Sequence, residues 1–159
     1  MVKVLVLSDS HGNIINMEQA VKEISPDMIF HLGDCWADAA VLNRMFPHIT
    51  MVQVPGNCDC VSEPLERILE LEGKRILLCH GHAYNVKSSL LSLEYAAREK
   101  KADIVFYGHT HMPALDWNNG VRLYNPGSVG APRFMNSASY GVLMLDEAAD
   151  MVDFQTKCI

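Results

Sequence analysis

The sequence predicts a mixed α/β protein in which two sheets pack together with helices outside them. Two patterns support this fold class: short apolar runs alternate with helical patterns early in the chain, and hairpin signals dominate the rest. A third observation is that the chain has no sign of a division into separate domains. The 159 residues contain no linker, low-complexity tract or internal repeat, so we expect one domain, residues 1–159.

Five short apolar runs have the length and the flanking residues of buried strands. They are Val2–Leu7, Met28–Leu32, Ile49–Val54, Arg75–Cys79 and Ile104–Tyr107. Helical patterns lie between several of these runs, at Ile14–Ile24, Trp36–Phe46 and Ser88–Lys101. Asn13 is a good N-cap for the first helix, and prolines follow the first two.

The remaining strands are expected in antiparallel pairs. Glu72-Gly73 separates Leu65–Leu71 from the run that ends at Cys79, which indicates a hairpin. Asn118-Asn119-Gly120 is a strong turn signal between two further short strands. The predicted strands of the last two pairs are Ala114–Trp117 with Val121–Tyr124, and Tyr140–Leu145 with Met151–Phe154.

Composition excludes several classes of protein. Hydrophobic residues make up 49% of the chain and charged residues 20%, which is typical of a globular protein rather than a disordered one. The formal charge of -6 and the lack of a basic track argue against long nucleic acids as partners. No apolar run is long enough for a membrane helix, and the run at Val2–Leu7 is too short for a signal peptide. We therefore expect a cytoplasmic protein without a membrane partner.

The five cysteines leave one alternative open. Their odd number and the missing secretory signal argue against a disulfide framework. Cys58-Asp59-Cys60 is not the C-x-x-C spacing of common zinc sites. The alternatives are free, partly buried thiols and a zinc-thiolate site, and the latter requires Cys35, Cys58, Cys60 and Cys79 to converge.

Polar, metal-ligating side chains follow each of the five predicted strands. Each motif alone also fits an ordinary turn, but sites in α/β sheets form at the carboxyl ends of strands, and five loops of this kind can meet there. The motifs are Ser8-Asp9-Ser10-His11, Gly33-Asp34, Gly56-Asn57-Cys58-Asp59, His80-Gly81-His82 and Gly108-His109-Thr110-His111. Of the seven histidines, His31 and His48 lie outside these motifs; His31 is expected to be structural and His48 to lie in an exposed turn.

The residue types in these motifs favour divalent metals. Oxygen ligands come from Asp9, Asp34 and Asn57, and imidazole ligands from His11, His80, His109 and His111. Such a set suits manganese, iron, zinc or nickel. Seven ligands are too many for one ion with an open position, and they suit two ions about 3.5–4 Å apart.

These five ordered motifs resemble those of the calcineurin-like metallophosphoesterases. Chain length, motif spacing and Asn125-Pro126-Gly127-Ser128 are similar to the small single-domain phosphodiesterases of the YfcE type. The resemblance implies a four-layer α/β/β/α sandwich. It also implies that one metal takes Asp9, His11, Asp34 and His111, and that the other takes Asp34, Asn57, His80 and His109. Asp34 and a hydroxide would bridge the two ions.

The resemblance further implies hydrolysis of phosphodiester bonds by attack of the bridging hydroxide. Manganese is the favoured metal, with nickel, zinc or iron as alternatives. Larger members of the superfamily have histidine where this chain has Cys58, which leaves the general acid unassigned. Candidate catalytic residues are His82, which can also be a structural histidine, and the ligand Asn57. Candidate substrate-binding residues are Cys58 and Arg133, the latter otherwise explained by a surface ion pair.

Two other functions remain open at this point: a phosphomonoesterase of the same chemistry, and a non-catalytic scaffold on the same fold. The expected substrate is a small or nucleotide-like phosphodiester, because the chain has no residues to spare for a lid. A homo-oligomer is possible if an apolar surface forms. Residues that can contribute to it are Trp36, Met45, Phe46, Phe134 and Met135.

Overall fold

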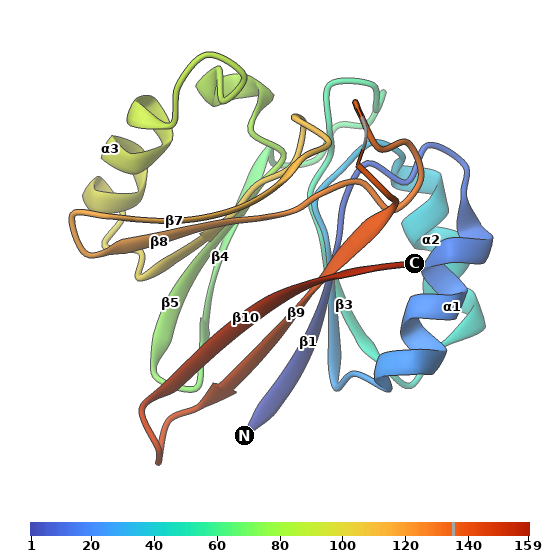
Figure 1. Cartoon of the computed structure of the whole chain (residues 1–159), viewed down its shortest axis with the longest axis horizontal. Coiled ribbons are helices and arrows are strands. Elements are labelled where there is room, and N and C mark those ends of the chain that lie inside the picture. The colour runs from blue at the N-terminus through green and yellow to red at the C-terminus, as the bar shows by residue number, and fades with distance from the viewer. Residues whose placement is uncertain (135) are drawn as a thin grey trace.

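The computed structural model describes residues 1–134 and 136–159, in which ten strands form two five-stranded mixed sheets (Figure 1). The first sheet has the order β10-β9-β1-β2-β3. Its strands are Val2–Leu7 (β1), Met28–His31 (β2), Thr50–Gln53 (β3), Ser139–Asp146 (β9) and Met151–Cys158 (β10). β1, β2 and β3 are parallel, and β9 and β10 extend the sheet in antiparallel pairs.

The second sheet has the order β4-β5-β6-β8-β7. Its strands are Glu66–Leu71 (β4), Lys74–Cys79 (β5), Ile104–Phe106 (β6), Pro113–Asn118 (β7) and Val121–Pro126 (β8). The parallel strands β5, β6 and β8 form its centre, and the two edge strands are added by hairpins. Asn119 and Gly120 both have positive φ in the β7–β8 turn, which is the backbone that the Asn-Gly signal predicted.

Helices cover the outer face of each sheet. Figure 1 shows α1 (Ile14–Ile24) and α2 (Trp36–Met45) beside the first sheet and α3 (Leu91–Glu99) beside the second. The side chain of Asn13 caps α1 by accepting the Asn16 N–H, as its position in the sequence predicted. The two sheets and their helices therefore form a four-layer α/β/β/α sandwich.

Three apolar clusters fill the three spaces between these layers. In β1, Val4 and Val6 point between the two sheets, whereas Leu5 and Leu7 point toward α1. A third cluster, which includes Leu77 and Val105, packs the second sheet against α3. Because both faces of the central strands are buried, those strands are continuous apolar runs rather than alternating ones.

The structure confirms the predicted fold class and most element positions. β1 and α1 have the predicted bounds, and the other predicted strands and α2 differ by at most a few residues at their ends. α3 begins at Leu91 instead of the predicted Ser88. The chain makes turns before it, where Asn85 has a left-handed backbone and its carbonyl accepts the Ser88 N–H.

The predicted apolar surface is only partly exposed. Met45 and Phe134 are exposed, Trp36 and Phe46 are half-buried, and Met135 lies outside the described residues. None of the helices in the described part of the chain has the length and apolar character that a membrane-spanning segment requires.

The described cysteines are free, and their burial varies widely. Cys79 is buried beneath α3, Cys35 is half-buried, and the others, including Cys58 and Cys60, are exposed. Within residues 1–134 and 136–159, the groups of side chains close enough to hold a metal ion contain no cysteine. The structure therefore favours a metal site of carboxylates and imidazoles over a zinc-thiolate site.

Candidate metal centre

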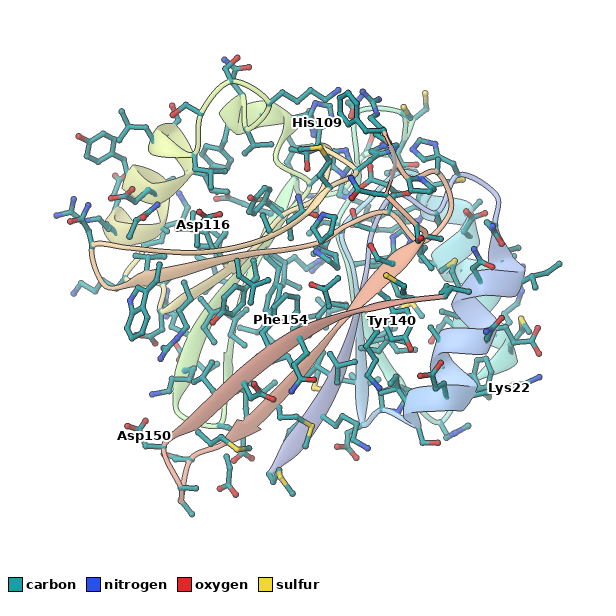
Figure 2. The ribbon with its side chains drawn as sticks, viewed as in Figure 1. Lys22, His109, Asp116, Tyr140, Asp150 and Phe154 are labelled. Atoms are coloured by element: carbon teal, nitrogen blue, oxygen red, sulfur yellow. The ribbon has the colours of Figure 1, made fainter. Side chains whose placement is uncertain are left out.

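The five polar motifs meet at one edge of the sandwich, where strand ends from both sheets come together. Figure 2 shows His109 at this edge, between the two sheets. Backbone hydrogen bonds fix the loops against one another: Asp9 N–H donates to the Gly33 carbonyl at 2.9 Å, and Gly108 N–H donates to the His80 carbonyl at 2.9 Å. The prediction that these loops converge is therefore confirmed.

Asp9, which follows β1, is the centre of the cluster. It is fully buried, and its Oδ2 accepts the Ser8 hydroxyl at 2.5 Å and the His109 N–H at 3.1 Å. Its Oδ1 faces three imidazoles, with Nε2 of His111 at 3.1 Å, of His80 at 3.7 Å and of His11 at 4.0 Å. One carboxylate oxygen is thus held in place while the other points at potential co-ligands.

Asp34, which follows β2, divides its oxygens in the same way. Its Oδ1 accepts the Cys58 N–H at 2.9 Å. Its Oδ2 lies 3.5 Å from His80 Nε2 and 3.7 Å from His11 Nε2. The Asp34 carboxylate therefore stands between a histidine of the first sheet and a histidine of the second.

Two groups of these side chains have ligand atoms within 4.8 Å of one another: Asp9 with His11 and His111, and Asp9 with Asp34 and His80. The two groups overlap in Asp9, so this carboxylate belongs to both candidate groups. The resemblance placed the shared carboxylate at Asp34, and in the structure both carboxylates lie between the histidines.

The other two predicted ligands lie at the border of this cluster. The ring centroid of His109 is 5.1 Å from that of His80. Asn57 is exposed on the loop after β3, and its Nδ2 lies 3.7 Å from Cys58 Sγ. The structure therefore brings five of the predicted ligands into compact groups and leaves His109 and Asn57 next to them.

Backbone contacts fix which nitrogen each central histidine presents. Nδ1 of His80 is 2.7 Å from the Leu32 carbonyl oxygen, and Nδ1 of His111 is 2.5 Å from the Ala131 carbonyl oxygen. A carbonyl can only accept, so Nδ1 donates in both rings. When such a ring is neutral, its Nε2 has a free lone pair facing the carboxylates, the arrangement typical of metal-ligating histidines.

The backbone at the predicted ligands is strained. Five of them have positive φ, a backbone region that residues other than glycine rarely adopt. These residues are Asp9 (φ 54), His11 (φ 43), Asp34 (φ 46), His109 (φ 70) and His111 (φ 60). Such strain concentrates where a site must be held in a set geometry.

Two glycines allow the loops to approach closely enough to form the site. A Cβ on Gly108 would overlap the Ser8 hydroxyl and the Asp9 carboxylate. A Cβ on Gly56 would overlap the side chain of Asp34. The glycines in the predicted motifs thus leave space for the two carboxylates.

The residues present fit divalent cations. Asp9 Oδ1 and His80 Nε2 are buried and have no hydrogen-bond partner in the described part of the chain. Buried polar atoms are nearly always paired, because an unpaired one costs about 1–3 kcal/mol. A carboxylate oxygen and an imidazole lone pair that face one another without a proton between them are suited to a shared cation.

The protonation states agree with this reading. Burial raises the pKa of Asp9, but the neighbouring His111 and His80 imidazoles and the Ser8 hydroxyl outweigh it and lower the pKa below its usual value. Burial, together with the neighbouring His80, lowers the pKa of His109 to about 4. Near pH 7 the cluster therefore offers a carboxylate and a neutral imidazole, the forms that bind metals.

Sequence reasoning missed the residues that hold the ligand loops. Asp38 Oδ2 accepts the Gly12 N–H at 2.7 Å, and Ser128 donates its hydroxyl to the Asp9 carbonyl at 2.8 Å. Asp59 accepts three backbone N–H groups, from Asp34, Trp36 and Gly56. Asp59 and Ser128 lie in motifs that carry the family resemblance, and that position could have indicated their role in holding the loops.

The three remaining predicted site residues lie around the cluster. His82 begins a 3₁₀ helix, His82–Tyr84, and its ring centroid is 5.4 Å from that of His80. Cys58 is exposed, and a hydrogen bond to Asp34, followed by partial burial, raises the pKa of its thiol. Arg133 is exposed on the loop that supplies the Ala131 carbonyl to His111. Their predicted roles stay predictions.

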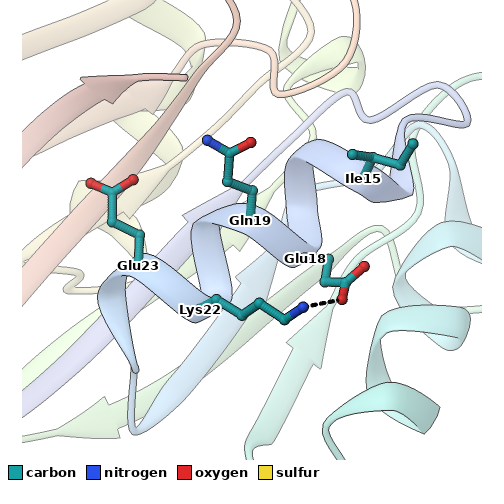
Figure 3. Close-up of a pocket in the computed structure, with 5 residues that line it drawn as sticks. All are labelled: Ile15, Glu18, Gln19, Lys22 and Glu23. Carbon is teal, nitrogen blue, oxygen red and sulfur yellow. Dashed lines mark hydrogen bonds and ion pairs between the residues drawn. The ribbon is translucent and has the colours of Figure 1, made fainter.

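A surface hollow elsewhere is unrelated to these residues. Figure 3 shows it on the outer face of α1, where Lys22 and Glu18 form an ion pair at 2.5 Å. Its lining residues are Ile15, Glu18, Gln19, Lys22 and Glu23. None of them belongs to a predicted motif, so a substitution in this hollow is a suitable control for substitutions near the ligand groups.

Comparison with known proteins agrees with this geometry. The model of the calcineurin-like phosphoesterase superfamily domain matches residues 2–148. The probable metallophosphoesterase YsnB of Bacillus subtilis is 34% identical over 155 residues, which cover 95% of this chain and 89% of that protein. The phosphodiesterase YfcE of Escherichia coli K12 is 30% identical over 170 aligned positions, which cover 90% of this chain and 88% of that protein.

A solved structure extends the likeness to the fold. The crystal structure of a predicted phosphoesterase from Streptococcus pneumoniae TIGR4 superposes with a TM-score of 0.80 at 29% identity. The superposition covers 98% of this chain and 89% of that one. The whole sandwich, with both sheets that supply the ligand groups, is therefore shared.

Proposed function

The chain belongs to the calcineurin-like phosphoesterase superfamily, and on that basis we propose that it hydrolyses phosphodiester bonds with two divalent metal ions. The observation that carries the proposal is the pair of ligand groups that overlap in Asp9. The buried, unpartnered Asp9 Oδ1 and His80 Nε2 lie within those groups. The phosphodiesterase YfcE, a relative at 30% identity, supports a diester as the substrate.

We propose that Asp9, His11, Asp34 and His111 hold one ion, and that Asp34, Asn57, His80 and His109 hold the other. The donor set suits manganese, which we propose first, with nickel, zinc or iron as alternatives. Two such ions, when bound, lower the pKa of a water molecule and neutralise charge on the phosphoryl oxygens.

The protein's own residues then have distinct tasks. Asp9 and Asp34 supply negative charge at the junction of the sheets, and the carbonyls of Leu32 and Ala131 keep two histidines in the orientation that presents Nε2. His82 is the candidate proton donor to the leaving oxygen, because its ring lies next to His80 and His109. Cys58 and Arg133, both exposed beside the cluster, are candidates for contact with the substrate phosphate.

The site is open to solvent, which supports small and varied diesters. The side chain of His11 is 32% exposed, and Asn57 and Cys58 are exposed. No residues of the described chain form a lid domain over them, since the ten strands and their helices account for the sandwich itself. A nucleotide-like diester can therefore reach the ligand groups directly.

The test is hydrolysis of bis(p-nitrophenyl) phosphate by chelator-stripped protein, with and without manganese, and with p-nitrophenyl phosphate alongside. We expect manganese to restore diester cleavage and monoester cleavage to stay weak. Asp34→Asn should lose the restored activity, whereas Asp150→Asn, at a side chain 86% exposed, should keep it.

Two outcomes would contradict the proposal. Preferential monoester cleavage would make the chain a phosphomonoesterase of the same chemistry. Folded protein without activity in manganese, nickel, zinc or iron would leave a scaffold as the remaining interpretation.

A further inference from the structure

A cavity beside the ligand groups has so far been assigned no substrate group. Its volume is about 180 Å³. Among the residues that line it are Leu65, Glu66, His80, His82, Ala83 and Tyr84. It lies where the start of β4 faces the 3₁₀ helix after β5, so it opens directly beside the histidines.

The wall of this cavity is mostly apolar. Leu65 is 49% exposed at the rim. Ala83 is exposed as well, and Tyr84 contributes an aromatic ring that packs on the apolar cluster beneath α3. An apolar wall with a small volume suits one flat ring system better than a larger group.

One charged group gives the wall its polarity. Glu66 Oε2 accepts the Tyr84 hydroxyl at 2.5 Å, and Glu66 Oε1 lies 3.4 Å from the Lys100 ammonium. Burial, followed by this hydrogen bond, raises the pKa of Tyr84, so the hydroxyl remains a donor to the carboxylate. Each carboxylate oxygen keeps a further lone pair, which favours a ligand with N–H donors and disfavours an anionic one.

Two histidines in the wall of the cavity link it to the candidate metal centre. His80, a proposed metal ligand, and His82, the candidate proton donor, both line it. A proton donor must reach the oxygen that leaves phosphorus. If the leaving group of the diester occupies this cavity, its ester oxygen lies near His82, which is where the proposed proton donor is needed.

We propose that this cavity binds the leaving group of the phosphodiester and selects a neutral, flat ring with N–H donors, as nucleobases have. This inference rests on the proposed function, because it assigns one part of the diester to the cavity. It narrows the substrate to diesters whose leaving group is a nucleoside and names the residues that select it: Leu65, Glu66, Ala83 and Tyr84.

The first test measures ring binding without metal or turnover. Adenosine is titrated into chelator-treated, ¹⁵N-labelled protein, and we expect saturable amide shifts centred on residues 65, 66, 83 and 84. Ala83→Phe fills the cavity and should weaken binding about tenfold or more. Gln19→Phe fills the hollow on α1 shown in Figure 3 and should leave adenosine binding unchanged.

A second pair of probes tests the role of Glu66. Benzamide and benzoate share one ring but differ in charge, and we expect the wild-type protein to bind benzamide more tightly. Glu66→Gln keeps an acceptor for the Tyr84 hydroxyl and removes the negative charge, so it should abolish the preference for benzamide.

If Ala83→Phe does not fold, Ala83→Leu gives the same cavity-filling test with a smaller side chain.

A turnover experiment separates this inference from the proposed function. Methyl p-nitrophenyl phosphate has one aromatic leaving group, and we expect Ala83→Phe, with manganese, to lower its kcat/KM about tenfold relative to Gln19→Phe. Absence of hydrolysis by the wild-type protein would overturn the proposed function even if adenosine binds. Hydrolysis without adenosine binding, or equal activity of both variants, would overturn the assignment of the cavity and leave the proposed function intact.

Discussion

His80 Nδ1 lies 2.7 Å from the carbonyl oxygen of Leu32, and this contact joins the two sheets at the metal centre. Leu32 follows β2 of the first sheet, and His80 follows β5 of the second. The contact does two things at once: it satisfies a buried carbonyl, and it turns Nε2 toward Asp9 and Asp34. Packing of the sheets and orientation of a ligand therefore depend on one imidazole.

The two tasks of this histidine can be separated by substitution. In His80→Asn the amide nitrogen can replace Nδ1 as donor to Leu32, but no atom replaces Nε2. We expect stability without metal to fall by only about 1 kcal/mol, within the range for a modified hydrogen bond. Manganese at about 100 times its Kd should stabilise the wild type by about 2.7 kcal/mol and His80→Asn far less.

Urea unfolding with manganese and with chelator measures both quantities. His48→Asn, at an exposed histidine outside the motifs, is the matched control and should retain the full manganese effect. Equal stabilisation of His80→Asn and the wild type would show that Nε2 is not a ligand.

Asp38 should control metal affinity without touching the metal. Its Oδ2 accepts the Gly12 N–H at 2.7 Å and so holds the loop that carries His11. Residues that orient ligands in this way typically change metal affinity about 10- to 100-fold when removed. We expect Asp38→Ala to weaken manganese binding by that factor, measured by the electron paramagnetic resonance signal of free manganese.

Asp38→Asn retains an oxygen that can accept the same N–H, so it should recover much of the affinity. If Asp38→Ala binds manganese as tightly as the wild type, the loop is held by other contacts.

His31 should make the metal-free protein less stable at mildly acidic pH. It is buried; its Nδ1 lies 3.3 Å from the Gly33 N–H, and its Nε2 lies 3.0 Å from the Ser10 hydroxyl. Burial lowers its pKa to about 4 from the ordinary 6.5. Between these values the unfolded chain binds a proton that the folded protein excludes, so stability falls as pH drops from about 6.5 toward 4.

By pH 5 this histidine should account for a loss of about 2 kcal/mol relative to pH 7. The measurement is urea unfolding in chelator at both pH values. His31→Asn, whose amide oxygen can accept the Gly33 N–H, should show a smaller pH dependence, while His48→Asn should match the wild type. A pH dependence in His31→Asn as steep as in the wild type would count against this assignment.

His82 should matter most for substrates whose leaving group needs a proton. p-Nitrophenolate leaves readily without one, whereas an alkoxide does not. We therefore expect His82→Ala to lower turnover more for a diester with a poor leaving group than for bis(p-nitrophenyl) phosphate, by a factor of about 10². Equal losses on both substrates would remove His82 as the proton donor and leave a structural role.

The fold was predictable because its central strands are buried on both faces. The continuous apolar run Val2–Leu7 became β1 with the same bounds, since Val4 and Val6 face one layer and Leu5 and Leu7 face another. Helix bounds depend on local caps, and α1 was predictable for this reason. The turns before α3 were not, because nothing in Ser88–Leu90 by itself stops a helix.

The ligand types were predictable, but their partners were not. Five polar motifs after five strands indicated a metal centre, and Asp9, Asp34 and His80 do converge. The carbonyl that orients His80 belongs to the other sheet. The Glu66–Tyr84 contact in the adjoining cavity joins the start of β4 to the 3₁₀ helix after β5, and no local sequence pattern predicts that contact. Contacts of this kind depend on how the two sheets pack.

The three apolar clusters contain none of the predicted ligands. The apolar core and the proposed chemistry therefore draw on different amino acids, although His80 also links the two sheets. Mutation of a proposed ligand would leave the apolar core intact, so a variant without a metal centre could persist as a stable protein and acquire a new role. Conversely, the loops that carry the ligands can diversify over many generations while the layers beneath them stay the same.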